Sequence, residues 1–379
     1  MPIEEIENDT LVYKGANFFK QRLLLSTLSG KPVKIKDIRS DFSDPGLREF
    51  EVCLVRLLDK VTNGTVIELN NSGTAIYFRP GLLQGGTITH DCCLKRGIGY
   101  YIDVLLAIGP FCKNPLNVIF KGVTNSKDSP SIDHIKSAAF PILKRFIVVD
   151  DGLELKIKKR GILPDGGGEV HFKCPVKKSL RSLQVVNPGM VKRIRGTAFT
   201  CKVSPAMANR TVESAKGVML KFLPDVYINT DQNKGRLSGN SPGYGISLVA
   251  ETTEGVFFAT EEISFSKTED SKQTVPEDLG NKVAIRLLDE IYRGGCADST
   301  YQWLIALYMA LGQSNVSKYL VGPLSQYSIH FLQHLRDFFS ITFKLENPED
   351  DEDDSIPGFT KVLMTCVGIN YTNISKRVN

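Results

Sequence analysis

Long hydrophobic segments are missing from this sequence of 379 residues. No run of about 18 or more apolar residues occurs, whereas a helix that crosses a bilayer needs about 20. The first ten residues, MPIEEIENDT, are acidic and polar, so they lack the basic and apolar regions of a secretory signal peptide. Both absences argue against a membrane-spanning or exported protein.

Paired cysteine motifs are also absent. The sequence contains eight cysteines but no Cys-x-x-Cys pair, which excludes the usual spacing of zinc ligands. Most of the cysteines lie in apolar segments, and the adjacent Cys92 and Cys93 are interpreted as structural residues. Scattered cysteines of this kind are typical of buried thiols in a reducing compartment. We therefore expect no metal site, no disulfide framework and no cofactor.

The sequence contains neither Gly-x-Gly-x-x-Gly nor Gly-Lys-Ser/Thr, the motifs of nucleotide-binding loops. It has three consecutive glycines instead, Gly166, Gly167 and Gly168, between the segments LELKIKK and EVHFKC. Both segments alternate apolar and polar residues, which predicts two strands. A phosphate loop joins a strand to a helix whose N-terminal amides face the phosphate. The glycines are therefore predicted to form a strand-to-strand loop, in which they permit positive φ and close backbone approach.

Charge is distributed unevenly along the chain, whose net charge is +5. Residues 156–195 contain eleven Lys and Arg but only Asp165 and Glu169 as acids, so this basic block carries 11 − 2 = +9. Apolar residues at strand spacing indicate that the block is folded, with its charges along one face. A nucleic acid partner and a solvated surface remain equal alternatives on charge alone. The acidic run 346–354, with seven acids in nine residues, is interpreted as solvated surface.

The same order of predicted elements occurs three times: a helix, a strand, a second helix and two closing strands. The first helices are predicted to begin near residues 17, 97 and 298, so the second spacing is much longer than the first. Two of the second helices are predicted to open at Asp44-Pro45 and Ser129-Pro130, since a capping side chain followed by proline is typical of a helix start. The sequence thus indicates an internal repeat that is interrupted once.

The interrupting segment reads as a small α/β domain of its own, with the strand GTAFTCKV, a helix opened by Ser204-Pro205 and three further strands. The predicted fold class is therefore α/β, built from α+β repeats: three similar repeats, each with two helices and a four-stranded sheet, and one small inserted α/β domain. The predicted domains are repeat 1 (1–92), repeat 2 (93–183), the inserted domain (187–278) and repeat 3 (279–379).

The segment RGILPDGGGEV, from Arg160 to Val170, resembles the glycine-rich signature of the RNA 3'-terminal phosphate cyclase superfamily. Further segments are similar to that superfamily in the same order: FRPGLLQGG (78–86), EDLG (277–280), GGCAD (294–298), YMAL (308–311) and TCVGINYTN (365–373). The resemblance spans essentially the whole chain. It implies three similar α/β repeats with one inserted domain, which agrees with the repeat found independently by periodicity.

The resemblance also shows where this chain departs from an active cyclase. The cyclases form a covalent adenylate on a histidine, transfer AMP to an RNA 3'-phosphate and close a 2',3'-cyclic phosphate. The residue that matches this histidine is Tyr327, and Asn17, Lys20, Trp303 and Leu304 stand at the places of other active-site residues. The resemblance therefore implies a degenerate former active site at these five positions. We expect no cyclase activity and no catalytic residue.

These departures are similar to the noncatalytic eukaryotic branch of the superfamily, which the phrases GNSPGYGISLVAETTEG and LSTLSGKPVKI also resemble. The branch implies a ribosome-biogenesis factor of the nucleus and nucleolus, part of the small-subunit processome and required for early cleavages of pre-18S rRNA. The implied partners are a large processome GTPase, a small nucleolar RNP and pre-rRNA, and the chain is expected to be a monomer. The candidate RNA or anion contacts are Lys159, Arg160, Lys192, Arg193 and Arg195.

The alternative function is an endonuclease that cleaves pre-rRNA itself. A metal-dependent nuclease needs clustered carboxylates, but a repulsive run such as 346–354 rarely forms an ordered site. A metal-free nuclease needs a general acid and base, which the segment HFLQHLRD offers through His330, His334, Arg336 and Asp337. The competing structural interpretation is a helix that packs its apolar residues inward and leaves these polar residues at the surface.

Overall fold

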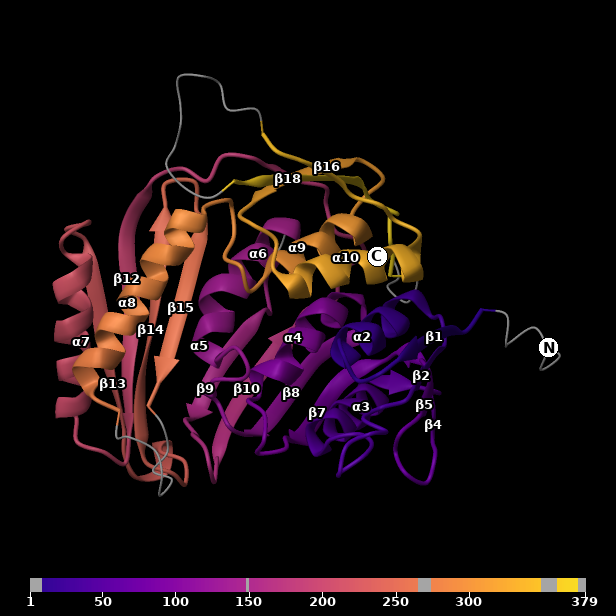
Figure 1. Ribbon diagram of the computed structural model, residues 1–379, viewed down its shortest axis with the longest axis horizontal. Coiled ribbons are helices and arrows are strands. Elements are labelled where there is room, and N and C mark those ends of the chain that lie inside the picture. Colours follow the sequence, from indigo (N-terminus) through magenta and orange to yellow (C-terminus); the bar gives the residue numbers. More distant parts are fainter. Residues whose placement is uncertain (1–8, 148–149, 265–273, 349–359, 374–379) are drawn as a thin grey trace.

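The computed structural model describes residues 9–147, 150–264, 274–348 and 360–373 of the chain. Within these residues the strands form four sheets of four strands each and one short two-stranded ladder. Three of the sheets belong to three similar repeats, and the fourth belongs to a domain inserted into the third repeat (Figure 1). The predicted fold class is therefore confirmed.

Each repeat has the connectivity β-α-β-α-β-β. Its first two strands run parallel because a helix connects them, and its fourth strand pairs antiparallel between the second and the third. In the first repeat the sheet order is β1-β2-β5-β4. The elements of this repeat are β1 (Leu11–Lys14), α2 (Phe19–Ser29), β2 (Val33–Lys36), α3 (Glu49–Val61), β4 (Val66–Leu69) and β5 (Ile76–Arg79), with the ladder β3 (Thr62–Asn63) and β6 (Leu82–Leu83).

The second and third repeats have the same strand arrangement, with the orders β7-β8-β10-β9 and β11-β16-β18-β17. The second repeat consists of β7 (Gly85–Asp91), α4 (Gly99–Ile108), the 3₁₀ turn η1 (Gly109–Phe111), β8 (Asn114–Gly122), α5 (Ile132–His134), the π-helical turn η2 (Ile135–Ala139), α6 (Phe140–Phe146), β9 (Glu154–Lys159) and β10 (Gly168–Cys174). The third consists of β11 (Gln184–Val185), α9 (Gln302–Leu311), β16 (Val316–Val321), α10 (Gln326–Phe339), β17 (Lys344–Glu346) and β18 (Val362–Val367).

The inserted domain interrupts the third repeat between β11 and α9. Its sheet has the order β13-β12-β14-β15, and α8 packs against α7 and against β14 and β15. Its elements are β12 (Val191–Cys201), α7 (Ala206–Met219), β13 (Val226–Asn233), the 3₁₀ turn η3 (Gly235–Leu237), β14 (Gly243–Thr252), β15 (Phe257–Ile263) and α8 (Pro276–Arg293).

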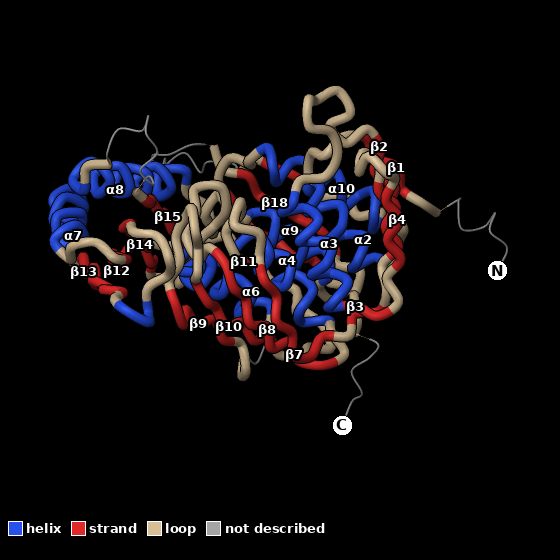
Figure 2. The backbone as a smooth tube through the Cα atoms, turned by 90° about the horizontal axis from the view of Figure 1, so that it is seen from below, coloured by secondary structure: helices blue, strands red, loops and turns tan. Residues whose placement is uncertain are grey.

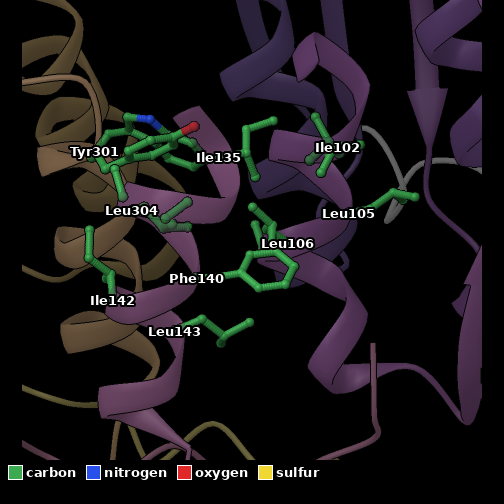
Figure 3. Packing of buried hydrophobic residues seen from close by; sticks show 14 of the residues in the cluster. Ile102, Leu105, Leu106, Ile135, Phe140, Ile142, Leu143, Tyr301 and Leu304 are labelled. Carbon is green, nitrogen blue, oxygen red and sulfur yellow. The ribbon is translucent and has the colours of Figure 1, made fainter. Parts of the chain in front are cut away.

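The helices of the three repeats gather inside the molecule, and their sheets lie at the periphery (Figure 2). Helix α2 contacts α4 and α10, and α9 contacts the same two helices, so four helices from three repeats meet. Helices α4 and α9 are apolar on almost every side, as expected for helices that are covered all round. Figure 3 shows Leu106 of α4 packed on Phe140 of α6, with Leu304 of α9 in the same buried cluster.

The structure corrects several predicted boundaries. The boundary at residue 92 falls after β7, although β7 pairs with β8 of the second sheet. The boundary at residue 278 falls inside α8, which packs on the inserted sheet. Helix α3 begins at Glu49 and not at Asp44-Pro45, because the Glu51 carboxylate accepts a hydrogen bond from the backbone N–H of Arg48 at 2.7 Å and caps the helix there. Among the described residues, no helix is long and apolar enough to cross a bilayer.

Candidate functional site

Helices from all three repeats meet around the ammonium group of Lys20, which lies in the first turn of α2. Its Nζ donates a hydrogen bond to Oδ2 of Asp103 on α4 at 2.8 Å. The ring centroids of Tyr100 on α4, Trp303 on α9 and Tyr327 on α10 lie 4.9, 5.8 and 5.8 Å from this Nζ. We call these five residues the Lys20 cluster. The Lys20 cluster lies where the three repeats meet, which is also where the former active site was predicted.

The charges of the Lys20 cluster compensate each other. The side chain of Asp103 is 3% exposed and that of Lys20 is 13% exposed. Two opposite charges removed from water in this way are stable as a pair, because either one alone would lose its hydration without compensation. Since the pair is neutral and aromatic rings surround the ammonium, the cluster offers a phosphate group no net positive charge.

The protonation states of the cluster do not favour nucleophilic attack. Burial lowers the pKa of Lys20, but the Asp103 carboxylate and the phenol groups of Tyr327 and Tyr100 outweigh burial and raise this pKa above its ordinary value. Burial also raises the pKa of Tyr327 above 10.0, and Lys20 opposes that effect only in part. At neutral pH Lys20 is an ammonium ion and Tyr327 is a neutral phenol. Neither group presents the free lone pair or anion that attack on a phosphate requires.

The structure brings together three of the five residues predicted for the former active site: Lys20, Trp303 and Tyr327. Leu304 is fully buried in the hydrophobic core, in the same cluster as Ile135 and Ile142 (Figure 3). Asn17 is exposed in the turn before α2. The sequence analysis missed Asp103, although one acid inside the apolar segment GIGYYIDVLLAIG is a signal for a buried and partnered carboxylate.

Two residues of the nuclease alternative hold α10 against the first repeat. His334 is buried, and its Nδ1 lies 2.9 Å from Oε1 of Gln21. Asp337 accepts a hydrogen bond from the hydroxyl of Tyr13 at 3.0 Å. Burial, together with the nearby charge of Arg22, lowers the pKa of His334 to about 4, so this imidazole is neutral at physiological pH. Both side chains therefore serve the interface between the first and third repeats.

The other two residues of that alternative lie nearer the surface. His330 is half-buried and stacks on Phe18 with 4.3 Å between ring centroids. Arg336 is exposed near the end of α10. The four predicted residues are thus divided between a buried interface and the surface. This division does not give the paired general acid and base that a metal-free nuclease requires.

Three of the predicted RNA contacts, on strand β12, form ion pairs within the inserted domain. Lys192 and Arg193 share the carboxylate of Glu251 at 2.8 and 2.6 Å, and Arg195 pairs with Asp225 at 2.8 Å. The three basic side chains are 39, 43 and 38% exposed. The Arg195–Asp225 pair is exposed on both sides, since Asp225 is 53% exposed, and such a pair contributes only about 0–1 kcal/mol. Glu251 is 14% exposed, so its pairs with Lys192 and Arg193 are less easily exchanged for a phosphate.

Arg160 is buried, which corrects the expectation that it contacts RNA. Its side chain is 3% exposed and donates to Asp133 at 2.6 Å and to Asp231 on β13 at 3.2 Å. The guanidinium carbon also lies 4.3 Å from the ring centroid of Phe199. Arg160 therefore joins the second repeat to the inserted domain. Its neighbour Lys159 is only half-buried and has no ion-pair partner among the described residues.

Gly166 and Gly167 lie between β9 and β10, and Gly168 is the first residue of β10, so the glycines join two strands as the sequence predicts. Gly166 and Gly167 have φ values of +56° and +74°, which other residues adopt only with strain. The carbonyl of Gly166 accepts a hydrogen bond from the backbone N–H of Asn240 at 3.0 Å, and the side-chain amide of Asn240 donates to the carbonyl of Asp165 at 3.2 Å. The loop is thus docked on the inserted domain, beside the contact made by Arg160.

We expect Gly167→Val to lower the free energy of unfolding by about 2 kcal/mol. A β-branched residue is strained at this φ, and its Cβ would lie 2.8 Å from the side-chain amide of Asn240. Urea denaturation measures the loss, and Gly235→Val is the matched control, since that glycine has φ +55° but no atom within 4 Å of the added Cβ. Unchanged stability with weaker binding of a partner or of RNA would show that the loop is a contact surface.

Within the part of the chain that the structure describes, no group of three or more His, Cys, Asp or Glu residues is placed to hold a metal ion. The eight cysteines are buried free thiols. Burial raises the pKa of Cys112 to about 12 and that of Cys201 to about 11, so both thiols are protonated at neutral pH. Most of the acidic run 346–354 lies outside the described residues.

The sequence is similar to proteins of one family along its whole length. The family model described as RNA 3'-terminal phosphate cyclase matches residues 11–345. A Drosophila melanogaster protein described as a probable RNA 3'-terminal phosphate cyclase-like protein is 66% identical, with 100% of both chains covered. The human RNA 3'-terminal phosphate cyclase-like protein is 54% identical over 97% of this chain and 98% of its own. A Schizosaccharomyces pombe protein described as rRNA processing protein rcl1 is 40% identical over 97% of this chain and 98% of its own.

Proposed function

The chain belongs to the RNA 3'-terminal phosphate cyclase family, and from this premise we propose that it is a noncatalytic factor of rRNA processing. The name of the Schizosaccharomyces pombe relative, rRNA processing protein, supports the process. The noncatalytic part of the proposal rests on the protonation of Tyr327. This residue occupies the position of the cyclase nucleophile as a neutral phenol, and the ammonium beside it is already neutralised by Asp103.

The proposal extends to the place of action and the partners that the family resemblance implies. We propose a factor of ribosome biogenesis in the nucleolus that belongs to the small-subunit processome and is needed for early cleavages of pre-18S rRNA. Its partners are a large processome GTPase, a small nucleolar RNP and pre-rRNA. A compact structure in which buried helices join three repeats is suited to a scaffold that several partners contact.

The endonuclease alternative has less support from the geometry. His334 and Asp337 are committed to contacts with Gln21 and Tyr13, which leaves His330 and Arg336 without a positioned acid–base partner from the predicted set. Incubation of the purified protein with pre-rRNA, with and without Mg²⁺, tests this alternative. Cleavage that is lost in a His330→Ala/His334→Asn double variant of unchanged melting temperature would favour the nuclease.

The direct test of the noncatalytic proposal is Tyr327. We expect no AMP on the protein after incubation with ATP and Mg²⁺, and we expect Tyr327→His to give no cyclisation, because Trp303 and Leu304 stand where the cyclases place polar groups. In cells depleted of the native protein, Tyr327→Phe should sustain nearly normal pre-rRNA processing, since it removes at most one hydrogen bond of about 1 kcal/mol. Radiolabelled AMP that the wild-type protein retains and Tyr327→Phe loses would overturn the proposal.

We further propose that Lys159, Lys192, Arg193 and Arg195 contribute electrostatic affinity for pre-rRNA. Neutral substitutions at the four positions should weaken binding, most strongly at low salt. They should also reduce the slope of log K against log salt by about 0.7 per lost phosphate contact on single-stranded RNA. Fluorescence anisotropy with a pre-rRNA fragment measures both quantities. Arg160 is kept unchanged so that the contact between the second repeat and the inserted domain stays intact. If the RNA affinity and the salt slope are unaltered, the four cations are only part of the solvated surface.

A further inference from the structure

The inserted domain has an apolar groove near the start of β12 and the ends of α7 and α8. Figure 1 shows how these elements are arranged. The volume of the groove is about 580 Å³, within the usual range of about 300–1,000 Å³ for binding cavities. The apolar walls come from Met190 just before β12, Ile194 on β12, Phe222 after α7, Phe258 on β15, and Leu288 and Ile291 in the last turns of α8. The groove is therefore formed by side chains that the inserted domain alone contributes, with Lys361 at its edge.

Large apolar side chains are exposed along this groove. Met190 is 78% exposed, Phe222 is 67% exposed and Tyr292 on α8 is 52% exposed, and all three line the same cavity. Removal of such side chains from water favours binding, because apolar surface is buried. A concave cluster of exposed Met, Phe and Tyr is typical of a protein-binding surface, whereas single exposed apolar residues are common everywhere.

The charges at the rim favour an acidic ligand. Lys361 lines the groove, and Lys221 lies next to Phe222 in the sequence and is exposed. Among the described residues neither lysine has an ion-pair partner. The acid that lines the groove is Asp289. A carboxylate of a ligand beside the apolar face would therefore meet Lys361, which has no ion-pair partner among the described residues.

The backbone around the groove favours a helix over an added strand. The lining strands β12 and β14 are inner strands of the sheet, and their backbone groups are already paired with neighbouring strands. The third lining strand, β15, is at the edge of the sheet, where it contacts α5 and η2 of the second repeat. A ligand strand would find no free edge on them, so recognition must proceed through side chains. The groove also lies where α7 and α8 end, in the layer of helices that covers the sheet. A ligand helix would continue this layer.

We propose that this groove binds an α-helix of a partner protein, with large apolar side chains at positions i, i+3 or i+4 and i+7 and with Asp or Glu beside them. The proposal rests on the proposed function, in which the chain acts through partners, and it assigns one of those contacts to a defined surface. An apolar groove of this kind does not suit RNA, whose backbone requires several positive charges.

Photocrosslinking identifies the occupant. The residues Met190 and Phe222 are replaced, one at a time, by p-benzoylphenylalanine in the full chain in cells, and the crosslinked segment is identified by mass spectrometry. Leu82 on β6 in the first repeat is the control position, because it is 80% exposed outside the groove. We expect positions 190 and 222 to capture the same segment of one partner protein, with the stated apolar and acidic pattern, and position 82 to miss it.

A synthetic peptide of the captured segment then tests the chemistry with the purified full chain. We expect Phe222→Glu to weaken binding at least tenfold, Lys361→Glu to weaken it several-fold and more strongly at low salt, and Leu82→Glu to leave it unchanged. All three variants should keep the wild-type melting temperature, because positions 222 and 82 are largely exposed and Lys361 lies at the rim. The peptide should become more helical by circular dichroism when it binds.

Several outcomes would overturn the proposal: capture of RNA, of a second copy of this chain, of the chain's own residues, of a segment without the apolar spacing, or of nothing. Pre-rRNA cleavage is followed in the same cells. If the groove positions capture no helix while depletion of the protein still blocks rRNA processing, the groove is excluded and the proposed function stands. If the helix is captured but depletion leaves rRNA processing normal, the proposed function falls and the groove stands.

Discussion

Replacement of Lys20 by methionine should lower the free energy of unfolding by about 3–5 kcal/mol, as expected when one partner of a buried ion pair is removed. The Asp103 carboxylate would then lose its ion-pair partner in the centre of the molecule, where its side chain is 3% exposed. The loss should appear in urea denaturation as a lower midpoint. The exposed pair Lys95–Glu49, whose side chains are 75 and 65% exposed, gives the matched control, and Lys95→Met should cost at most about 1 kcal/mol.

A double substitution distinguishes the loss of the ion pair from the effect of leaving one buried group without its partner. Lys20→Met/Asp103→Leu replaces both charges by apolar groups, and we expect it to recover most of the stability that Lys20→Met loses, since such replacements of a whole buried pair are often neutral. Recovery would show that the Lys20 cluster is an interface between repeats. If Lys20→Met instead keeps the wild-type stability but weakens the binding of RNA or nucleotide, the cluster is a ligand site.

The contacts of Lys20 explain why the predicted former active site acts as an interface between repeats. A cation whose charge is balanced by a buried carboxylate has little charge left for a phosphate, and here Nζ lies 2.8 Å from Asp103, whose side chain is 3% exposed. The ring of Tyr327 then packs over this ammonium and beside Trp303, with 6.2 Å between the two ring centroids. These contacts stabilise the junction of three repeats at three of the positions that the resemblance assigns to a former active site.

The repeated architecture could be predicted because it depends on local patterns. Helices α4 and α9 are continuous apolar segments long enough to identify without a partner, and the closing strands of each repeat alternate apolar and polar residues. The leading strands were missed for a physical reason. Strand β1 has four residues and β11 has two, so neither is long enough to show alternation. Strand β7 has seven residues, but its partner β8 follows only after α4, so nothing local shows that it begins the second repeat.

The pairing of charges could not be predicted, because it depends on residues far apart in the chain. Asp103 is separated from Lys20 by 83 residues, and Asp231 is separated from Arg160 by 71 residues. From the sequence, Arg160 is one of eleven cations in a basic block, which suggests a charged surface. Its side chain is nevertheless turned inward between two domains, while its neighbour Lys159 remains half-buried. Composition gave the charge of the segment but not the direction of each side chain.

Replacement of Arg160 by methionine tests this assignment, and we expect it to lower the free energy of unfolding by about 3 kcal/mol. The guanidinium reaches Asp133 and Asp231 together, which the single ammonium group of Arg160→Lys cannot reproduce, so the lysine variant should recover only part of the loss. Lys159→Met removes the same charge from the same strand and should change stability by less than about 0.5 kcal/mol. Limited proteolysis should cut Arg160→Met faster between the second repeat and the inserted domain.

The effect of Arg160→Met should also depend on pH. Burial raises the pKa of Asp133, but Arg160 outweighs burial and holds this pKa below its ordinary value of 3.8. A lowered carboxyl pKa stabilises the folded state above 3.8, and this contribution disappears as the pH falls through the folded value. The difference in the free energy of unfolding between wild type and Arg160→Met should therefore be constant near neutral pH and become smaller in acid. If Arg160→Met is as stable as wild type but binds pre-rRNA more weakly, Arg160 contacts RNA after all, and the junction between the two domains depends on the glycine loop and Asn240 instead.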